Sequence, residues 1–135
     1  MKKLAVTALS GLLLAAMAWG EEPQSKRLRP LNFDPFRVEL ASFSPEESGR
    51  IGRMVKGATI PQIQEKLASG QLTSEQLTLY FLASIRRQDE HLRGYIEINP
   101  QALLEARAAD RLRSSGTVLG PMHGIPVNLK DNINT

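Results

Sequence analysis

The residues best suited to chemistry lie near the C-terminal end of this chain of 135 residues. A turn rich in glycine and proline, residues 120–126, leads into Val-Asn-Leu-Lys at residues 127–130, an alternation typical of a β-strand. Lys130 ends this strand, and the neighbouring Val127 and Leu129 could remove water from its ammonium group. Because desolvation disfavours the charged form of lysine, such a residue can serve as a general base at neutral pH. The alternative is a surface lysine at the end of an edge strand, which the residue pattern by itself favours.

The same stretch resembles the segment around the catalytic lysine of the amidase signature family, serine hydrolases that cleave carboxamides. Members of that family commonly read Gly-Pro-Leu-x-Gly-Ile-Pro, followed by apolar residues and Lys-Asp-Asn. The matching positions are Gly120, Pro121, Met122 in place of leucine, Gly124, Ile125, Pro126, Lys130, Asp131 and Asn132. The upstream sequence is similar too, with two helices, the stretch Tyr-Ile-Glu-Ile-Asn-Pro and an alanine-rich helix that contains Ala106 and Asp110. The resemblance spans residues 57–135 and leaves residues 21–56 uncovered.

The resemblance implies a triad of a serine nucleophile, a second serine with a cis peptide bond, and Lys130 as the base. Lys130 is the one triad member that matches residue by residue, and Asp131 and Asn132 are expected to shape the loop. In the family both serines lie downstream of the lysine, and this sequence ends first. We therefore expect a truncated chain that is inactive alone. Ser114-Ser115-Gly116 is interpreted as the end of a helix and not as a nucleophile site.

The fold class implied by the resemblance is α/β. We expect the N-terminal part of the amidase-signature fold, a mixed β-sheet covered by helices, in incomplete form. Tyr95–Ile98 and residues 127–130 are the candidate strands. Residues 21–56 are expected to form an extended, proline-containing leader whose apolar side chains lie on a larger body.

Three helices are predicted after residue 57. Thr59 with Gln62 and Thr73 with Gln76 form capping boxes that begin the first two, and Asn99-Pro100 begins the third. The expected buried positions are Ile60, Ile63 and Leu67 in the first helix, Leu77, Phe81, Ile85 and Leu92 in the second, and Leu103, Leu104, Ala108 and Leu112 in the third.

Residues 1–20 are typical of a secretory signal peptide. Lys2 and Lys3 precede an uncharged stretch of about 15 residues, which is shorter than a membrane-spanning helix needs. Small residues then follow at the spacing of a signal-peptidase site. An uncleaved membrane anchor is the alternative interpretation. We expect a secreted or periplasmic bacterial protein with no stable membrane insertion after cleavage.

Composition narrows the function classes further. The chain has no cysteine, which excludes a disulfide scaffold, a thiolate metal site and a cysteine nucleophile. Without Lys2 and Lys3 there are 15 basic and 14 acidic residues, so no nucleic-acid partner is expected. No cofactor or metal is implied, and His123 is interpreted as a loop residue. The expected substrate is a small-molecule or peptide amide. The rival interpretation is a small secreted helical module that binds a partner without catalysis.

Overall fold

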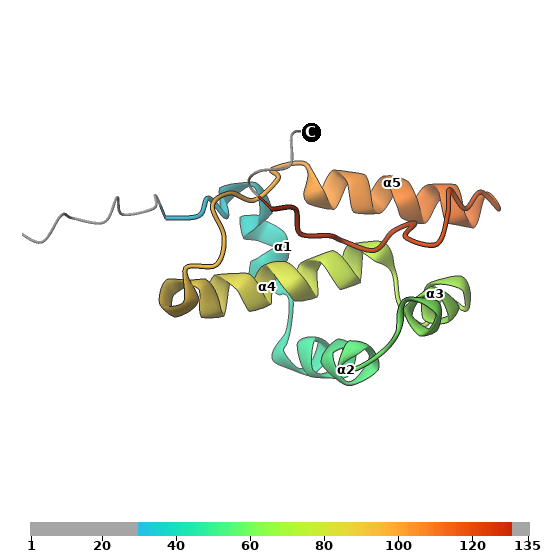
Figure 1. Cartoon of the computed structure of the whole chain (residues 1–135), viewed down its shortest axis with the longest axis horizontal. Coiled ribbons are helices and arrows are strands. Elements are labelled where there is room, and N and C mark those ends of the chain that lie inside the picture. Colours follow the sequence, from blue (N-terminus) through green and yellow to red (C-terminus); the bar gives the residue numbers. More distant parts are fainter. Residues whose placement is uncertain (1–29, 131–135) are drawn as a thin grey trace, which may run out of the picture.

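The computed structural model describes residues 30–130. Helix α4 is the longest element, and α1, α2 and α5 all pack against it (Figure 1). In Figure 1 the segment after α5 (red) turns back and runs between α5 and α4. The elements in chain order are η1 (Asp34–Phe36), α1 (Arg37–Ser42), α2 (Pro45–Val55), α3 (Ile60–Ala68), α4 (Ser74–Leu92) and α5 (Ala102–Ser114).

Helix α4 begins under two caps, one local and one from α5. The Thr73 hydroxyl accepts from the backbone N–H of Gln76 at 3.0 Å, and the Gln76 side chain accepts from the N–H of Thr73 at 3.1 Å. This is the predicted capping box. The Asp110 carboxylate in α5 accepts from the next two backbone donors, Ser74 N–H at 2.7 Å and Glu75 N–H at 3.0 Å. The otherwise unpaired amides at the start of α4 are thus satisfied across a sequence separation of 36 residues.

Replacing Asp110 by alanine should lower the free energy of unfolding by about 1–3 kcal/mol, because two part-buried amides lose a charged acceptor. Urea denaturation followed by circular dichroism measures this. The matched control is Glu90→Ala on the exposed surface of α4, expected to stay within about 0.5 kcal/mol of the parent chain. Equal stabilities of the two variants would show that the carboxylate is not a cap.

Two hydrophobic clusters lie on either side of α4. The first joins Leu79 and Leu82 of α4 to Phe36, Leu40 and Leu103. The second contains Ile51, Leu67, Leu72 and Leu77. Phe43, in the link between α1 and α2, packs against both clusters. Helix α4 therefore connects the two halves of the apolar interior.

The segment before residue 57 is more regular than predicted. Residues 34–55 form η1, α1 and α2. Ser44 caps α2 by accepting from the N–H of Glu47 at 3.1 Å, and Pro45 follows in the first turn. Phe36 and Leu40 of this segment are buried in the first cluster. Prolines here begin helices instead of preventing them.

The predicted mixed β-sheet is wrong for the described residues. Residues 30–130 contain no β-strand, and about 60% of them are helical. Tyr95–Ile98 is part of the link between α4 and α5, and residues 127–130 are extended but unpaired. Asn128 donates to the Tyr95 hydroxyl at 2.9 Å, so the two segments approach through side chains. No backbone hydrogen bond joins them in the described part, and a lone pair of strands is marginal in water.

The predicted helices are confirmed, but the predicted buried faces are correct only in part. Leu77 and Leu103 are buried as expected. Phe81 and Leu104 are instead 39% and 57% exposed, because α4 turns Leu79 and Leu82 toward the first cluster. A helix can carry apolar side chains on more than one face, and tertiary packing decides which of these faces is buried.

Arg107 of α5 forms ion pairs to two other helices. Its Nη2 lies 3.0 Å from Glu39 Oε1 in α1 and 2.7 Å from Glu75 Oε1 in α4. The pKa of the Glu39 carboxyl is lowered, first by a hydrogen bond from its own backbone N–H and next by a hydrogen bond from the Arg107 guanidinium. Hydrogen bonds to the same two carboxylates, first Glu75, raise the pKa of Arg107.

We expect the Glu39 contribution to stability to be present at neutral pH and lost in acid. A carboxyl whose pKa is lowered by folding stabilises the folded state above its unfolded pKa, and this is lost as the pH falls through the folded pKa. The difference in unfolding free energy between the parent chain and Glu39→Gln should therefore shrink below about pH 4. Glu46→Gln, at a carboxylate without an ion pair in the described part, is the control. A difference that is independent of pH would contradict this assignment.

Candidate functional site

The turn that precedes Lys130 is built from two glycines in unusual backbone conformations. Gly120 has φ +151° and Gly124 has φ +77°. The N–H of His123 donates to the Gly120 carbonyl at 3.1 Å, and the N–H of Ile125 donates to the Met122 carbonyl at 3.0 Å. A Cβ on Gly124 would collide with the Ser74 side chain. Glycine is therefore required at this position by both its backbone angle and its neighbour.

Two helices hold this turn by its carbonyl groups. Gln64 of α3 donates to the carbonyl oxygens of Pro121 at 2.8 Å and His123 at 3.0 Å. Arg113 of α5 donates to Gln64 Oε1 at 2.8 Å and to the His123 carbonyl at 3.0 Å. We call Gln64 and Arg113 the turn clamp. Neither residue was recognised from the sequence, because Gln64 lies 57 positions from Pro121 and no local spacing signals the contact.

The His123 side chain is buried, and both of its ring nitrogens form hydrogen bonds within the fold. Its side chain is 8% exposed, and its Nε2 lies 2.9 Å from the carbonyl oxygen of Ala109. Since a carbonyl only accepts, this Nε2 is the protonated nitrogen. The N–H of Leu119 donates to the other nitrogen, Nδ1, at 3.4 Å. Both nitrogens are therefore engaged inside the fold, in agreement with the interpretation of His123 as a loop residue.

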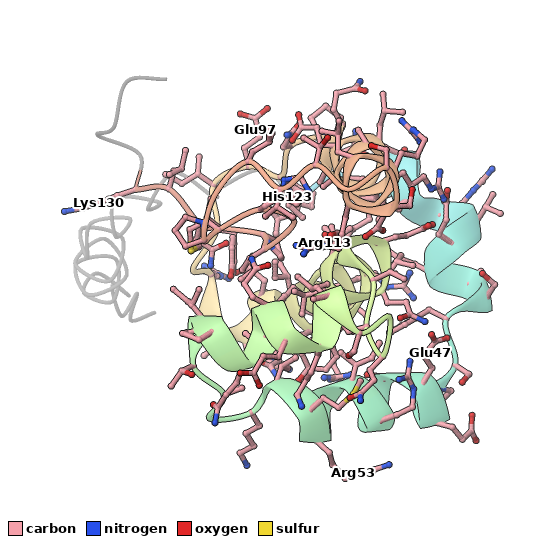
Figure 2. All side chains as sticks on the ribbon, turned by 90° about the vertical axis from the view of Figure 1, so that its right-hand side faces the viewer. Glu47, Arg53, Glu97, Arg113, His123 and Lys130 are labelled. Carbon is pink, nitrogen blue, oxygen red and sulfur yellow. The ribbon has the colours of Figure 1, made fainter. Side chains whose placement is uncertain are left out.

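Lys130 lies at the periphery, with its side chain directed away from the helices, whereas His123 and Arg113 lie inside (Figure 2). It is exposed, and the preceding Val127 and Leu129 are 60% and 59% exposed. The expected apolar walls around the ammonium group are not formed by the described residues. The role of Lys130 as a base stays a prediction, and Asp131 and Asn132 lie outside the described residues.

A groove of about 690 Å³ runs beside the segment that leads to Lys130. It lies between α4, α5, residues 95–99 and residues 124–129. Most of its wall is apolar, with contributions from Phe81, Ile85, Ile98, Ile125 and Val127. Its size suits a small ligand or an apolar side chain. Within residues 30–130 no cluster of three or more His, Cys, Asp or Glu side chains is placed to hold a metal ion.

Among the described serines, none forms a nucleophile–base pair with Lys130. The Ser74 hydroxyl is fully buried and has no hydrogen-bond partner in the described part. Gly116, with φ +86°, follows the end of α5, as expected for Ser114-Ser115-Gly116. Hydroxyl groups donate to a backbone oxygen three or four residues earlier at Ser42, Ser69, Ser84, Ser114 and Ser115.

Comparison with known proteins connects this turn to a family. A model of the family described as Amidase matches residues 76–135, the part that contains α5, the turn and Lys130. The C-terminal part of the chain is thus similar to members of the amidase family. The resemblance noted from the sequence is thereby confirmed.

The relatives that match this part of the chain are much longer proteins. A glutamyl-tRNA(Gln) amidotransferase subunit of Streptomyces coelicolor is 41% identical over 78 residues, which is 57% of this chain and 16% of the relative. A protein named probable amidase from Arabidopsis thaliana is 41% identical over 83 residues, 60% of this chain and again 16% of the relative. No solved structure matches the chain. The chain thus spans about one sixth of the length of these relatives.

Residues 1–20, the predicted signal peptide, lie outside the described residues. Within the described part, no helix combines the length and the apolar character required to cross a membrane.

Proposed function

We propose that this chain carries the general base of an amide hydrolase, and that the base is Lys130. The observation that carries the proposal is the amidase-family match, which includes the glycine–proline turn and the lysine that follows it. No ion pair of the described part engages the ammonium group of Lys130, which leaves it accessible to further polypeptide. Side chains of α3 and α5 hold the turn that leads to it.

In the proposed reaction, neutral Lys130 Nζ accepts a proton from a bridging serine, which accepts the proton of the nucleophilic serine. The nucleophile attacks the amide carbonyl, and backbone N–H groups stabilise the oxyanion. The C–N bond breaks as the nitrogen takes up the proton, and ammonia or an amine leaves. Water then hydrolyses the acyl ester by the same proton route in reverse.

The two serines of this scheme are proposed to belong to polypeptide outside the described residues. Five described serine hydroxyls donate to helix carbonyls, and the Ser74 hydroxyl is buried. The 135-residue chain alone is therefore proposed to be inactive. The proposed substrate is a small-molecule or peptide amide, and the proposed location is the periplasm or exterior, on the basis of residues 1–20.

The first test reads the DNA beyond the codon of Thr135. A glycine–serine-rich stretch with two serines, in frame or just after a stop codon, supports the proposal. The corresponding longer chain should hydrolyse amides, and the 135-residue chain should not. An unrelated downstream sequence, or turnover by the short chain at the rate of the long one, would overturn the serine–lysine scheme.

A helical binding module is the second candidate, favoured by one observation. Helices α4 and α5 leave an open, largely apolar groove in an otherwise helical structure. A single cooperative melting transition of the 135-residue chain, together with unrelated downstream DNA, would favour this candidate over the hydrolase.

A further inference from the structure

We propose that Gln64 and Arg113, the turn clamp, are positioning residues for Lys130. The proposal rests on the proposed function, since it concerns the placement of the same base. The clamp binds the carbonyls of the turn and not the lysine, so it acts through the backbone that leads to Lys130.

The turn is contacted by Gln64 of α3, 59 residues before His123, and by Arg113 of α5, 10 residues before it. The His123 carbonyl accepts from both Gln64 and Arg113, each at 3.0 Å. Arg113 also fixes the amide of Gln64 at 2.8 Å, so the two clamp residues restrain each other. The His123 ring adds a bond to Ala109 of α5. The turn is therefore fixed relative to α3 and α5 together, not to either helix alone.

Arg113 is an unfavourable choice if the only requirement at this position is a stable fold. Arg113 makes no ion pair among residues 30–130, and its Nε is buried without a hydrogen-bond partner. Its charge is directed at neutral oxygens of Gln64 and His123. A partly buried cation with one unsatisfied donor destabilises a fold, so its presence here calls for a role other than stability. Precise placement of the turn is such a role.

The path from the turn to Lys130 has one further anchor. Ile125 packs against the second hydrophobic cluster, and Asn128 donates to the Tyr95 hydroxyl at 2.9 Å. Two extended residues reach about 7 Å, so Lys130 cannot lie far from Asn128. The clamp sets where this path begins, and the Asn128–Tyr95 bond sets where it ends. A shift of about 1 Å in a reacting group can lower a rate a hundredfold.

The absence of cysteine gives a direct test on the 135-residue chain. Spin labels at K130C and Q88C, the latter on the exposed surface of α4, report the distance between Lys130 and α4 by pulsed electron spin resonance. Arg113→Met and Gln64→Leu should each broaden the distance distribution at least about twofold. Arg113→Lys, which retains donors, should restore a narrow distribution. Arg111→Met, at an exposed arginine of α5, is the matched control and should leave it unchanged.

The activity arm uses the longer, hydrolysing chain. Arg113→Met should lower kcat by about 10–100-fold with KM within about twofold, and Arg113→Lys should recover most of kcat. Unchanged distance distributions in both clamp variants overturn the clamp, whatever the activity. Broadened distributions with unchanged kcat overturn positioning. A longer parent chain that hydrolyses no amide overturns the proposed function instead, while the distances still decide whether the clamp holds the turn.

Discussion

Lys130→Ala should lower kcat/KM for amide hydrolysis by about a thousandfold or more in the longer, serine-bearing chain, because a general base and the activation of its nucleophile are lost together. Folding should be unaffected, since the Lys130 side chain is exposed and bound to no described residue. Steady-state kinetics on a series of amides, with circular dichroism of the same samples, measures both quantities.

Two further variants separate the base from its charge. Lys130→Arg keeps the positive charge but cannot give up a proton near neutral pH, so it should be as impaired as the alanine variant. Lys56→Ala, at an exposed lysine after α2, should retain the activity of the parent. Near-normal turnover by a well-folded Lys130→Ala protein would remove Lys130 from the mechanism.

Gly124→Ala should cause the largest loss of stability, roughly 2–5 kcal/mol in the free energy of unfolding, because two penalties combine at this position. An alanine at φ +77° is strained, and its Cβ would collide with the buried Ser74 side chain. Urea denaturation of the 135-residue chain measures the loss, and the exposed Gly57 provides a matched comparison.

Gly57 has nearly the same backbone angle, φ +75°, but a Cβ there would meet no atom within 4 Å. Gly57→Ala should therefore show the backbone penalty alone, about 1–2 kcal/mol. Ser74→Gly in the Gly124→Ala background should recover the collision component, which a double-mutant cycle isolates. Equal losses at Gly57 and Gly124 would mean that Ser74 moves aside freely.

The sequence predicted the helices correctly and the β-sheet wrongly, because helix signals act between neighbouring residues whereas strand pairing depends on distant ones. The capping boxes at Thr73 and Thr59 and the stop at Gly70 act within a few residues, so the sequence is enough to place them. A strand requires a partner at a distance, and alternation at residues 127–130 does not provide one. Alternating apolar and polar residues show that a segment could form a strand, but a strand forms only where a partner strand is available to pair with it.

In the candidate site, too, the contiguous residues were predicted from the sequence and the residues that make distant contacts were not. Lys130 and the glycine–proline turn were found because their residue types are contiguous. Gln64 and Arg113 were missed because their contacts to the turn cross 57 and 10 residues and depend on how α3 and α5 pack. The acceptor role of Asp110 was missed as well, since it lies 36 residues after the amide that it binds.

The late position of Asp110 has a consequence for biosynthesis. A ribosome adds about 5–20 residues per second, so the carboxylate that completes the start of α4 is made some seconds after Ser74. During that interval the nascent helix has its local Thr73 cap but lacks its second acceptor. Until α5 is made, the Ser74 and Glu75 amides have only water as an acceptor, so we expect the start of α4 to reach its full stability only after α5 has emerged.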